Sequence, residues 1–445
     1  MRNQLRSNHN SSFYPDTSVF TVSCHSSDQK TPKIDKPPPN DHSFDLAVVE
    51  FNDDGSLLSV EQKDALHDCI TRARHSNPNG ALVVVFIHGW HHSARWEDSH
   101  HASFRKVLAS LALREAERYS NHPRGRRVVG VYLGWHGDPA SWGGRWPTSR
   151  LTHLSFFNRY HTAKRIGEGH DLYGTVRDII ECTKAPMTNA QGDSPLVLLG
   201  HSMGALMLQS ALLKLLTRND PTLNQIAPKP DTPIHLRQDD QPISFPDVVI
   251  TLNSAADSRI MKGIIEELEQ RKLHKRAESD SISYDAPVLI SATAKNDLAT
   301  KLVWRLFPLH ILRKTDGHDH SLLTHVFAAA EANVRCEARP GVPDFGQDWS
   351  CLRLPQPERA PSPTFPIDLP NDRLPDGSRS SHTRYRLSPN SEQSKLAWIF
   401  QLPAHISAGH NDIFNTRSSL LLLSLMQIAG ATMSLASNWQ GNFEP

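Results

Sequence analysis

Seven short apolar runs constrain the fold more than any other feature of this sequence. Each run is continuous rather than alternating in hydrophobicity, which is typical of strands covered on both faces of a mostly parallel sheet. Helical patterns separate most of them, and strand–helix–strand repetition predicts an α/β fold, a doubly wound sheet with helices on both faces. The runs lie at 45–51, 81–89, 126–135, 195–200, 247–254, 287–293 and 396–403, and the helical patterns at 59–73, 101–119, 203–216, 258–274 and 321–334.

Proline-rich and polar segments fall outside this pattern and define the domain organisation. Residues 1–44, which include KPPPNDHS, carry too little apolar surface to offset the entropy of ordering and predict a disordered N-terminal tail. Residues 45–445 then form one domain, with irregular insertions at about 219–246 and 337–394. The 31 prolines and the hydrophobic fraction of 38% fit an ordinary core diluted by such segments.

Charge, cysteines and apolar stretches limit the partners and the location. Forty-eight Lys and Arg against 47 Asp and Glu leave a net charge of +1 and no basic stripe, so we expect no nucleic acid partner. The five cysteines show no C-x-x-C spacing, which favours a reducing compartment, although Cys336 and Cys351 could pair.

The most apolar stretch, 419–437, is interrupted by Ser, Gln, Gly and Thr, which predicts a packed helix rather than a membrane anchor. The first 24 residues also lack the apolar core of a secretory signal. We therefore expect a cytoplasmic protein without membrane contact.

A serine stands where an apolar strand passes into an apolar helix. Gly200-His201-Ser202-Met203-Gly204 has the form G-x-S-x-G, with glycines where a sharp turn leaves no room for side chains. Such a turn exposes the hydroxyl above the sheet edge and brings the next backbone N–H to a helix N-terminus. The alternative is a serine that only caps the helix.

With this motif and strand pattern, the chain resembles the α/β-hydrolase superfamily of serine hydrolases over most of 45–335 and 395–445. The resemblance implies that Ser202 is the nucleophile. It also implies an oxyanion hole made by the backbone N–H groups of Trp90, after the turn His88-Gly89, and of Met203. His88 is expected to hold that loop rather than to do chemistry.

The resemblance further implies an acid after a late strand. Asp297 follows the run at 287–293 and is favoured, while Asp257, after the run at 247–254, is the alternative. Either aspartate could instead cap the helix that follows it.

The base of such an enzyme comes last, in a loop before the final helix. In QLPAHISAGHNDIF the favoured residue is His410, and His405 is the alternative closer to its strand. A second group of candidate bases, His318, His320 and His325, precedes the last predicted strand. The order Ser202, Asp297, His410 is the order that the family shows.

Aromatic side chains gather in the loop expected at 133–167, after the run at 126–135, where ligands bind in α/β folds. They could wall a pocket for an acyl or aromatic group or, equally well, pack in the core. They are Trp135, Trp142, Trp146, Phe156 and Phe157. No metal is predicted for the histidine clusters, among them His88, His91 and His92, because no H-E-x-x-H string occurs.

These features predict a serine hydrolase of the esterase or lipase type that cleaves a small-molecule carboxylic ester through an acyl-enzyme and needs no cofactor. A thioesterase or amidase would use the same triad. A catalytically inactive interaction protein on this fold is the third interpretation.

Overall fold

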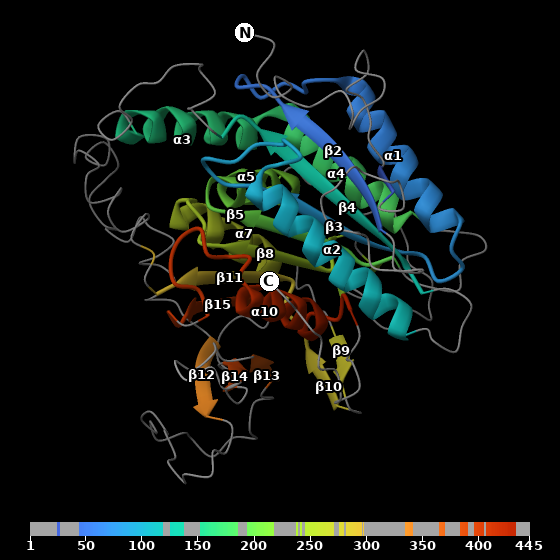
Figure 1. The fold of residues 1–445 in the computed structure, drawn as a ribbon, viewed down its shortest axis with the longest axis vertical. Helices are drawn as coiled ribbons and strands as arrows, with labels where there is room; N and C mark the ends of the chain where they lie inside the picture. The colour runs from blue at the N-terminus through green and yellow to red at the C-terminus, as the bar shows by residue number, and fades with distance from the viewer. Residues whose placement is uncertain are drawn as a thin grey trace.

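The computed structural model has an open sheet flanked by helices (Figure 1). Its strand order is β1-β2-β4-β3-β5-β8-β11-β15; the last seven run parallel, and β1 pairs antiparallel with β2 at the edge. All seven apolar runs form strands, within two residues at either end, so the predicted α/β architecture with a mostly parallel sheet is confirmed. The strands are β1 (His25–Ser26), β2 (Phe44–Phe51), β3 (Ala81–Ile87), β4 (Arg127–Trp135), β5 (Leu196–His201), β8 (Val248–Leu252), β11 (Leu289–Ala294) and β15 (Ala397–Leu402).

The structure describes residues 25–26, 44–118, 125–137, 152–185, 194–217, 237–238, 241–242, 245–270, 276–279, 282–295, 297, 334–340, 365–369, 383–389, 396–404 and 406–432. Except for β1 and Phe44, the predicted tail lies outside these residues, as does most of both predicted insertions and nearly all of the predicted helix at 321–334.

Helices cover both faces of the sheet, which explains why apolar residues occur at consecutive positions along the strands. Alternate strand residues point to opposite faces: Val83 and Val85 pack in one core, and Val84 and Phe86 in the other. The first core lies under α1 (Val60–His75), α3 (Thr152–Glu168), α4 (His170–Lys184), α5 (Met203–Thr217) and α7 (Ser258–Gln270), and the second under α2 (Ser99–Arg118) and α10 (Thr416–Ile428).

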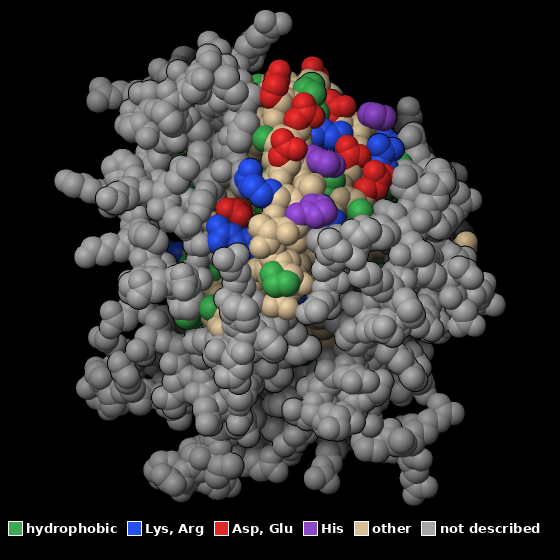
Figure 2. Space-filling view, turned by 90° about the vertical axis from the view of Figure 1, so that its right-hand side faces the viewer, with side chains coloured by type: hydrophobic (Ala, Val, Ile, Leu, Met, Phe, Trp, Pro, Cys, Tyr) green, Lys and Arg blue, Asp and Glu red, His purple; other side chains and the backbone are tan. Residues whose placement is uncertain are grey.

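The C-terminal helix α10 packs as predicted, because Leu421, Leu423 and Met426 are buried in the second core. Across the described residues, no helix is both long and apolar enough to cross a bilayer. On the described part of the face in Figure 2, acidic, basic and histidine side chains are interspersed.

Two stretches differ from the sequence predictions. The segment 133–167 was expected to be an aromatic loop, but its second half is helix α3, continued by α4. The predicted irregular insertion 337–394 contains strands, for which the period-two pattern of VRCEARP (334–340) was an overlooked signal.

The strands outside the main sheet form three small antiparallel units. In the first, β14 (Thr383–Pro389) pairs with both β12 (Val334–Pro340) and β13 (Phe365–Leu369). Two short pairs join β6 (Arg237–Gln238) to β7 (Gln241–Pro242) and β9 (Arg276–Ser279) to β10 (Ile282–Asp285). The strand β12 contacts β15, so this unit adjoins the main sheet.

The cysteines bear on location. Cys69, buried on α1, is disulfide-bonded, whereas Cys182 is a buried free thiol. A disulfide counts against the reducing compartment that the cysteine spacing indicated. The cytoplasmic location therefore stays a prediction.

Candidate active site

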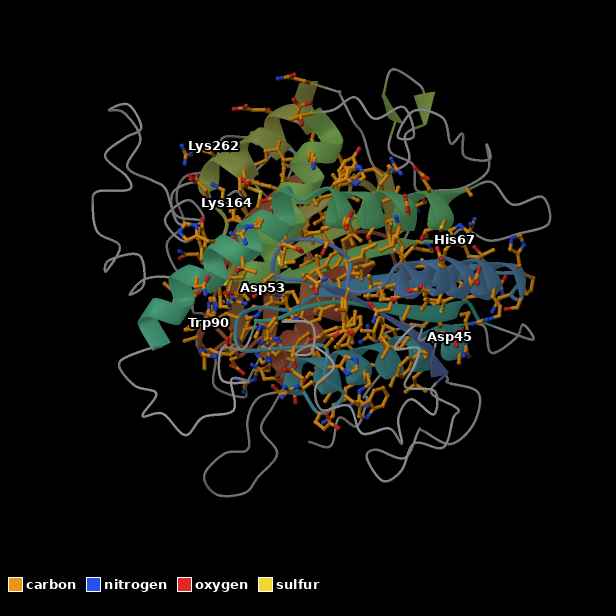
Figure 3. The ribbon with its side chains drawn as sticks, turned by 90° about the horizontal axis from the view of Figure 1, so that it is seen from above. Asp45, Asp53, His67, Trp90, Lys164 and Lys262 are labelled. Atoms are coloured by element: carbon orange, nitrogen blue, oxygen red, sulfur yellow. The ribbon has the colours of Figure 1, made fainter. Side chains whose placement is uncertain are left out.

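The carboxyl ends of the parallel strands gather at one edge of the sheet. In Figure 3, Asp45, near the start of β2, lies at the right, whereas Asp53, after the end of β2, and Trp90, after the end of β3, lie at the left. Ser202, Asp297 and His410 follow β5, β11 and β15, and so reach the same edge. Loops at this edge are the usual ligand site of α/β sheets.

Ser202 occupies a sharp turn between β5 and α5. Its φ is +54°, a left-handed conformation that non-glycine residues rarely adopt, and its N–H donates to Leu252 O at 3.0 Å. Glycines are required on either side. A Cβ on Gly200 would lie 2.7 Å from Ala205 Cα, and one on Gly204 would overlap the carbonyl oxygen of Ile87. The motif glycines therefore serve close packing, as the sequence indicated.

Three predicted residues form one hydrogen-bonded chain. Ser202 Oγ lies 2.6 Å from His410 Nε2, and His410 Nδ1 lies 2.9 Å from Asp297 Oδ2. Since a carboxylate only accepts, Nδ1 carries the imidazole proton and Nε2 is left to accept from the serine hydroxyl. The carboxylate is fully buried, while the His410 side chain is 15% exposed. This arrangement can transfer a proton from the hydroxyl to the imidazole.

The loop that carries His410 is held by its own hydrogen bonds. Ala408 N donates to Asp412 Oδ2 at 2.8 Å, and Ser407 Oγ donates to Asp412 O at 3.2 Å. Asn415 caps α10 by accepting from Ser418 N and also donates to Ile406 O at 2.9 Å. The loop is therefore an ordered turn rather than an open connection.

The alternative acid is paired with an arginine instead of the imidazole. Asp257 lies before α7, where it accepts from Arg259 N and forms an ion pair with the Arg259 guanidinium at 2.5 Å. It thus has the helix-capping role that the sequence left open. The alternative bases, His405 and the cluster His318, His320 and His325, lie outside the described residues.

The loop after β3 packs directly against the serine. A Cβ on Gly89 would lie 2.7 Å from His201 Nδ1 and 3.0 Å from Ser202 Cβ. The backbone N–H groups of Trp90 and Met203 have no acceptor within the described part of the chain. Met203 begins α5, where the first N–H groups have no partner in the helix. Both groups are therefore available as donors.

His88 holds this loop rather than facing the serine. Its Nδ1–H donates to Gly89 O at 2.9 Å, and its Nε2 accepts from Trp135 N at 3.1 Å. Trp135 Nε1 donates back to His88 O at 3.0 Å, with the two rings stacked. Burial lowers the pKa of His88 to about 4, so the ring is neutral near pH 7.

Trp135 is fully buried, so of the two roles left open for it, pocket wall or core, it has the second, and its backbone N–H also holds His88. Of the other aromatic residues, Phe156 lies on α3 and meets Trp90 edge to face at 5.2 Å between ring centres. Trp142, Trp146 and the Phe157 side chain lie outside the described residues.

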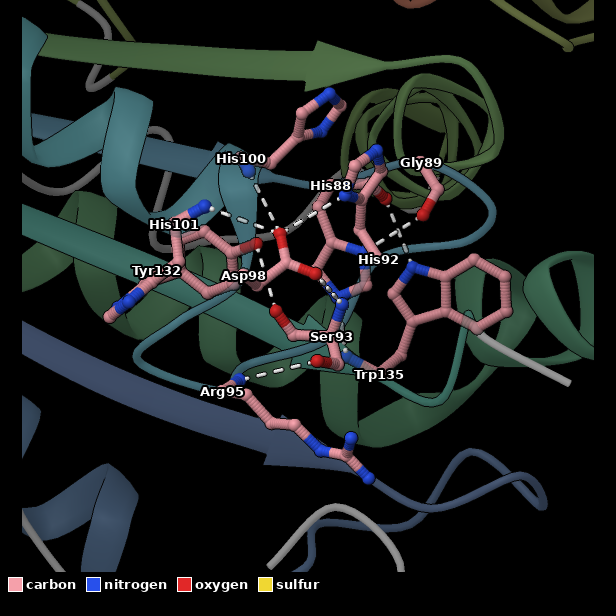
Figure 4. Close-up of polar contacts among 10 residues, drawn as sticks. All are labelled: His88, Gly89, His92, Ser93, Arg95, Asp98, His100, His101, Tyr132 and Trp135. Carbon is pink, nitrogen blue, oxygen red and sulfur yellow. Dashed lines mark hydrogen bonds and ion pairs between the residues drawn. The ribbon is translucent and has the colours of Figure 1, made fainter. Parts of the chain in front are cut away.

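Asp98 organises the rest of the loop (Figure 4). Its Oδ1 accepts from His100 N at 2.8 Å and from His92 Nδ1 at 3.0 Å, and its Oδ2 accepts from Ser93 N at 3.0 Å. Burial alone would raise the pKa of Asp98, but the bond from His92 and the other donors hold it below its ordinary value. The carboxylate is therefore ionised and closes the loop onto α2.

Two site residues were not singled out from the sequence. His201 Nε2 and Asn253 Nδ2 each lie 2.8 Å from the carbonyl oxygen of His410. Asn253 directly follows the buried strand β8 at the edge where Asp297 follows β11, and that position was a usable signal. His201 is the second residue of the G-x-S-x-G motif, and burial lowers its pKa far below the ordinary value.

Among the described residues, no three His, Cys, Asp or Glu side chains converge as a metal site. His92 and His100 stack face to face with ring centres 3.3 Å apart, a geometry in which ring nitrogens do not converge.

Compared with known proteins, the chain matches no family model, no curated protein and no solved structure.

Proposed function

We propose that this chain is a serine hydrolase of the α/β-hydrolase type that cleaves a carboxylic ester through an acyl-enzyme on Ser202. The observation that carries the proposal is the chain of hydrogen bonds from Ser202 Oγ through His410 to the buried carboxylate of Asp297, at 2.6 and 2.9 Å. Nucleophile, base and orienting acid in this geometry are the signature of acyl transfer by a serine.

The position of the three residues in the fold supports the same proposal. Ser202 leaves β5, in the middle of the sheet, while Asp297 and His410 come from loops after β11 and β15 on one side of it. The left-handed backbone at Ser202 is strain of the kind that accumulates at reactive residues. A serine that only caps a helix has no need of an imidazole at 2.6 Å.

In the proposed reaction, His410 Nε2 takes the proton of Ser202 Oγ as the oxygen attacks the ester carbonyl. Asp297 holds the ring in the tautomer that leaves Nε2 unprotonated and stabilises the imidazolium that forms. The C–O bond to the alcohol then breaks, and the imidazolium returns its proton to the leaving oxygen. Water then attacks the acyl-enzyme carbonyl as His410 takes its proton. The bond to Ser202 Oγ breaks, the serine regains a proton from His410, and the carboxylic acid leaves.

The negative charge on the carbonyl oxygen would be held by the backbone N–H groups of Trp90 and Met203. Loss of one such donor typically costs about 10²- to 10³-fold in rate. Trp90 and Phe156 add apolar surface beside these donors, which favours an acyl or aromatic group in the substrate.

The test is labelling with a fluorophosphonate probe and turnover of p-nitrophenyl esters of increasing chain length, with matched thioesters and anilides. We expect labelling at Ser202, its loss in Ser202→Ala, and fastest turnover of an ester. Ser110→Ala, at a partly exposed serine on α2 whose hydroxyl donates to Lys106 O, is the matched control and should behave as wild type.

Faster turnover of a thioester or anilide would change the substrate class but keep the triad. A folded wild-type protein that neither labels nor hydrolyses any of these substrates would overturn the proposal in favour of an inactive interaction protein on the same fold.

A further inference from the structure

We infer that His201 and Asn253 are positioning residues that hold the base, His410, by its backbone carbonyl oxygen. The inference rests on the proposed function, because it concerns what keeps the imidazole of His410 within hydrogen-bond distance of Ser202 Oγ. It starts from the convergence of two side-chain donors, from the ends of two different strands, on one oxygen atom.

Both donors lie 2.8 Å from His410 O. A carbonyl oxygen has two lone pairs, so the pair of donors saturates it. His201 is the last residue of β5, and Asn253 directly follows the neighbouring strand β8. The loop that carries His410, which follows β15, is therefore hydrogen-bonded to the ends of both strands.

Asn253 also connects the base to the acid. Its backbone has φ of +47°. Its Oδ1 accepts from Ala294 N at 2.6 Å, and its Nδ2 donates to His410 O. Ala294 O in turn accepts from Asp297 N at 3.1 Å. One amide side chain therefore ties the turn that carries the acid to the loop that carries the base.

His201 is held in one tautomer by the same contact. Because a carbonyl oxygen only accepts, Nε2 carries the proton and Nδ1 does not. This Nδ1 is fully buried, lies against Gly89 and has no hydrogen-bond partner among the residues that the structure describes. The groups around the ring are His410, His100, His92 and Asp297, so a neutral donor avoids adding a cation beside the imidazolium that forms in the reaction.

Both residues carry a cost that a purely structural contact would not require. A buried nitrogen without a hydrogen-bond partner lowers stability, and so does a non-glycine residue with left-handed backbone. Such features cluster where geometry is under functional constraint. Here both meet at one oxygen, which belongs to the residue that must face Ser202 Oγ within hydrogen-bond distance.

The experiment compares His201→Leu and Asn253→Asp with His201→Gln and Thr251→Val. His201→Leu removes one donor, and Asn253→Asp removes the other but keeps the acceptor for Ala294 N. In His201→Gln the side-chain amide retains a donor near the position of Nε2. Thr251→Val removes a buried hydroxyl on β8 that contacts Gln209 and not His410, and so controls for general loss of core order.

We expect His201→Leu and Asn253→Asp each to lower kcat and the rate of fluorophosphonate labelling about 10- to 100-fold with little change in KM, since small displacements of a catalytic group carry penalties of this size. The double variant should lose less than the product of the single losses, because both act on one oxygen. His201→Gln should recover most of the rate, and Thr251→Val should retain it.

Labelling of wild type at Ser202 tests the proposed function separately. If wild type labels, then wild-type rates in both donor variants, an equal loss in Thr251→Val, or an effect confined to KM overturns the inference. If wild type does not label, the proposed function fails, and the NMR signal of the His410 Nδ1 proton bound to Asp297 decides the inference alone. Its broadening in the two donor variants supports the inference, and its persistence unchanged overturns it.

Discussion

Two histidine–aspartate pairs lie at the same edge of the sheet, and their nitrogen–oxygen distances are nearly equal. His92 and Asp98 are 3.0 Å apart in the loop after β3, and His410 and Asp297 are 2.9 Å apart across the loops after β15 and β11. The members of the first pair are six residues apart in sequence, and those of the second 113. Distance between the partners therefore does not separate a structural pair from a candidate catalytic one.

The surroundings do separate them. The Asp98 carboxylate is shared with backbone N–H groups of Ser93 and His100, and the His92 ring stacks on His100, so the pair closes its own loop. In the second pair the other imidazole nitrogen faces Ser202 Oγ. A histidine–aspartate pair can act on a nucleophile only where the fold delivers that second nitrogen to it.

The sharpest way to break the comparison is to remove each imidazole. His410→Gln is expected to lower kcat/KM by about 10⁴-fold or more, because the group that takes the serine proton is lost. His92→Gln should keep most of the activity, since its ring faces Asp98 and His100. Ester turnover and labelling rates measure both, and a larger loss in His92→Gln than in His410→Gln contradicts the assignment of roles.

The carboxylates give the next largest contrast. Asp297→Asn is expected to cost about 10⁴-fold in kcat with normal folding, because an amide supports the wrong imidazole tautomer. Asp98→Asn should instead lower the free energy of unfolding by about 2 kcal/mol, since an ionised acceptor for several N–H groups is lost. Chemical denaturation read beside kcat distinguishes the two. The comparison breaks down if Asp297→Asn loses only stability.

The third contrast concerns pH and uses His88, whose folded-state pKa of about 4 lies below the ordinary value of 6.5. Between these values the unfolded chain takes up a proton that the folded chain does not, so stability is lost as pH falls from 6.5 toward 4. The loss from this residue reaches about 3 kcal/mol. Denaturation midpoints from pH 7.5 to 4.5 measure it.

His88→Gln should flatten that pH dependence while lowering stability at pH 7. His170→Gln, at a side chain that is 81% exposed, is the control and should leave the profile unchanged. An identical slope in wild type and His88→Gln would show that other groups set the pH dependence.

The smallest effect is expected from a single methyl group. Gly89→Ala places a Cβ 2.7 Å from His201 Nδ1 and 3.0 Å from Ser202 Cβ, so the loop that carries Trp90 must shift. We expect a loss of about 10- to 100-fold in kcat. Gly409→Ala, beside the base in the other loop, meets no atom of the described residues within 4 Å and should leave kcat near the wild-type value.

Much of the site could be predicted because its residues follow apolar strands. Ser202, Asp297 and His410 were predicted from the resemblance to α/β-hydrolases, through their positions after strands and their order in the chain, and the structure brings them within hydrogen-bond distance. Asn253 obeys the same rule after β8 and was overlooked because an amide carries no triad role. The role of Trp135 could not be decided from the sequence, because an aromatic residue at a strand end fits a pocket wall and the core equally well.

What the sequence by itself determined is the parallel sheet: seven continuous apolar runs can be buried only between two helical layers, so their burial is set by local composition. The tertiary structure decided which of many polar residues at the carboxyl edge meet. Asp257 and Asp297 both follow strands, yet one is paired with Arg259 two residues away and the other lies against His410. That choice depends on the register of strands and loops 113 residues apart, which no local pattern encodes.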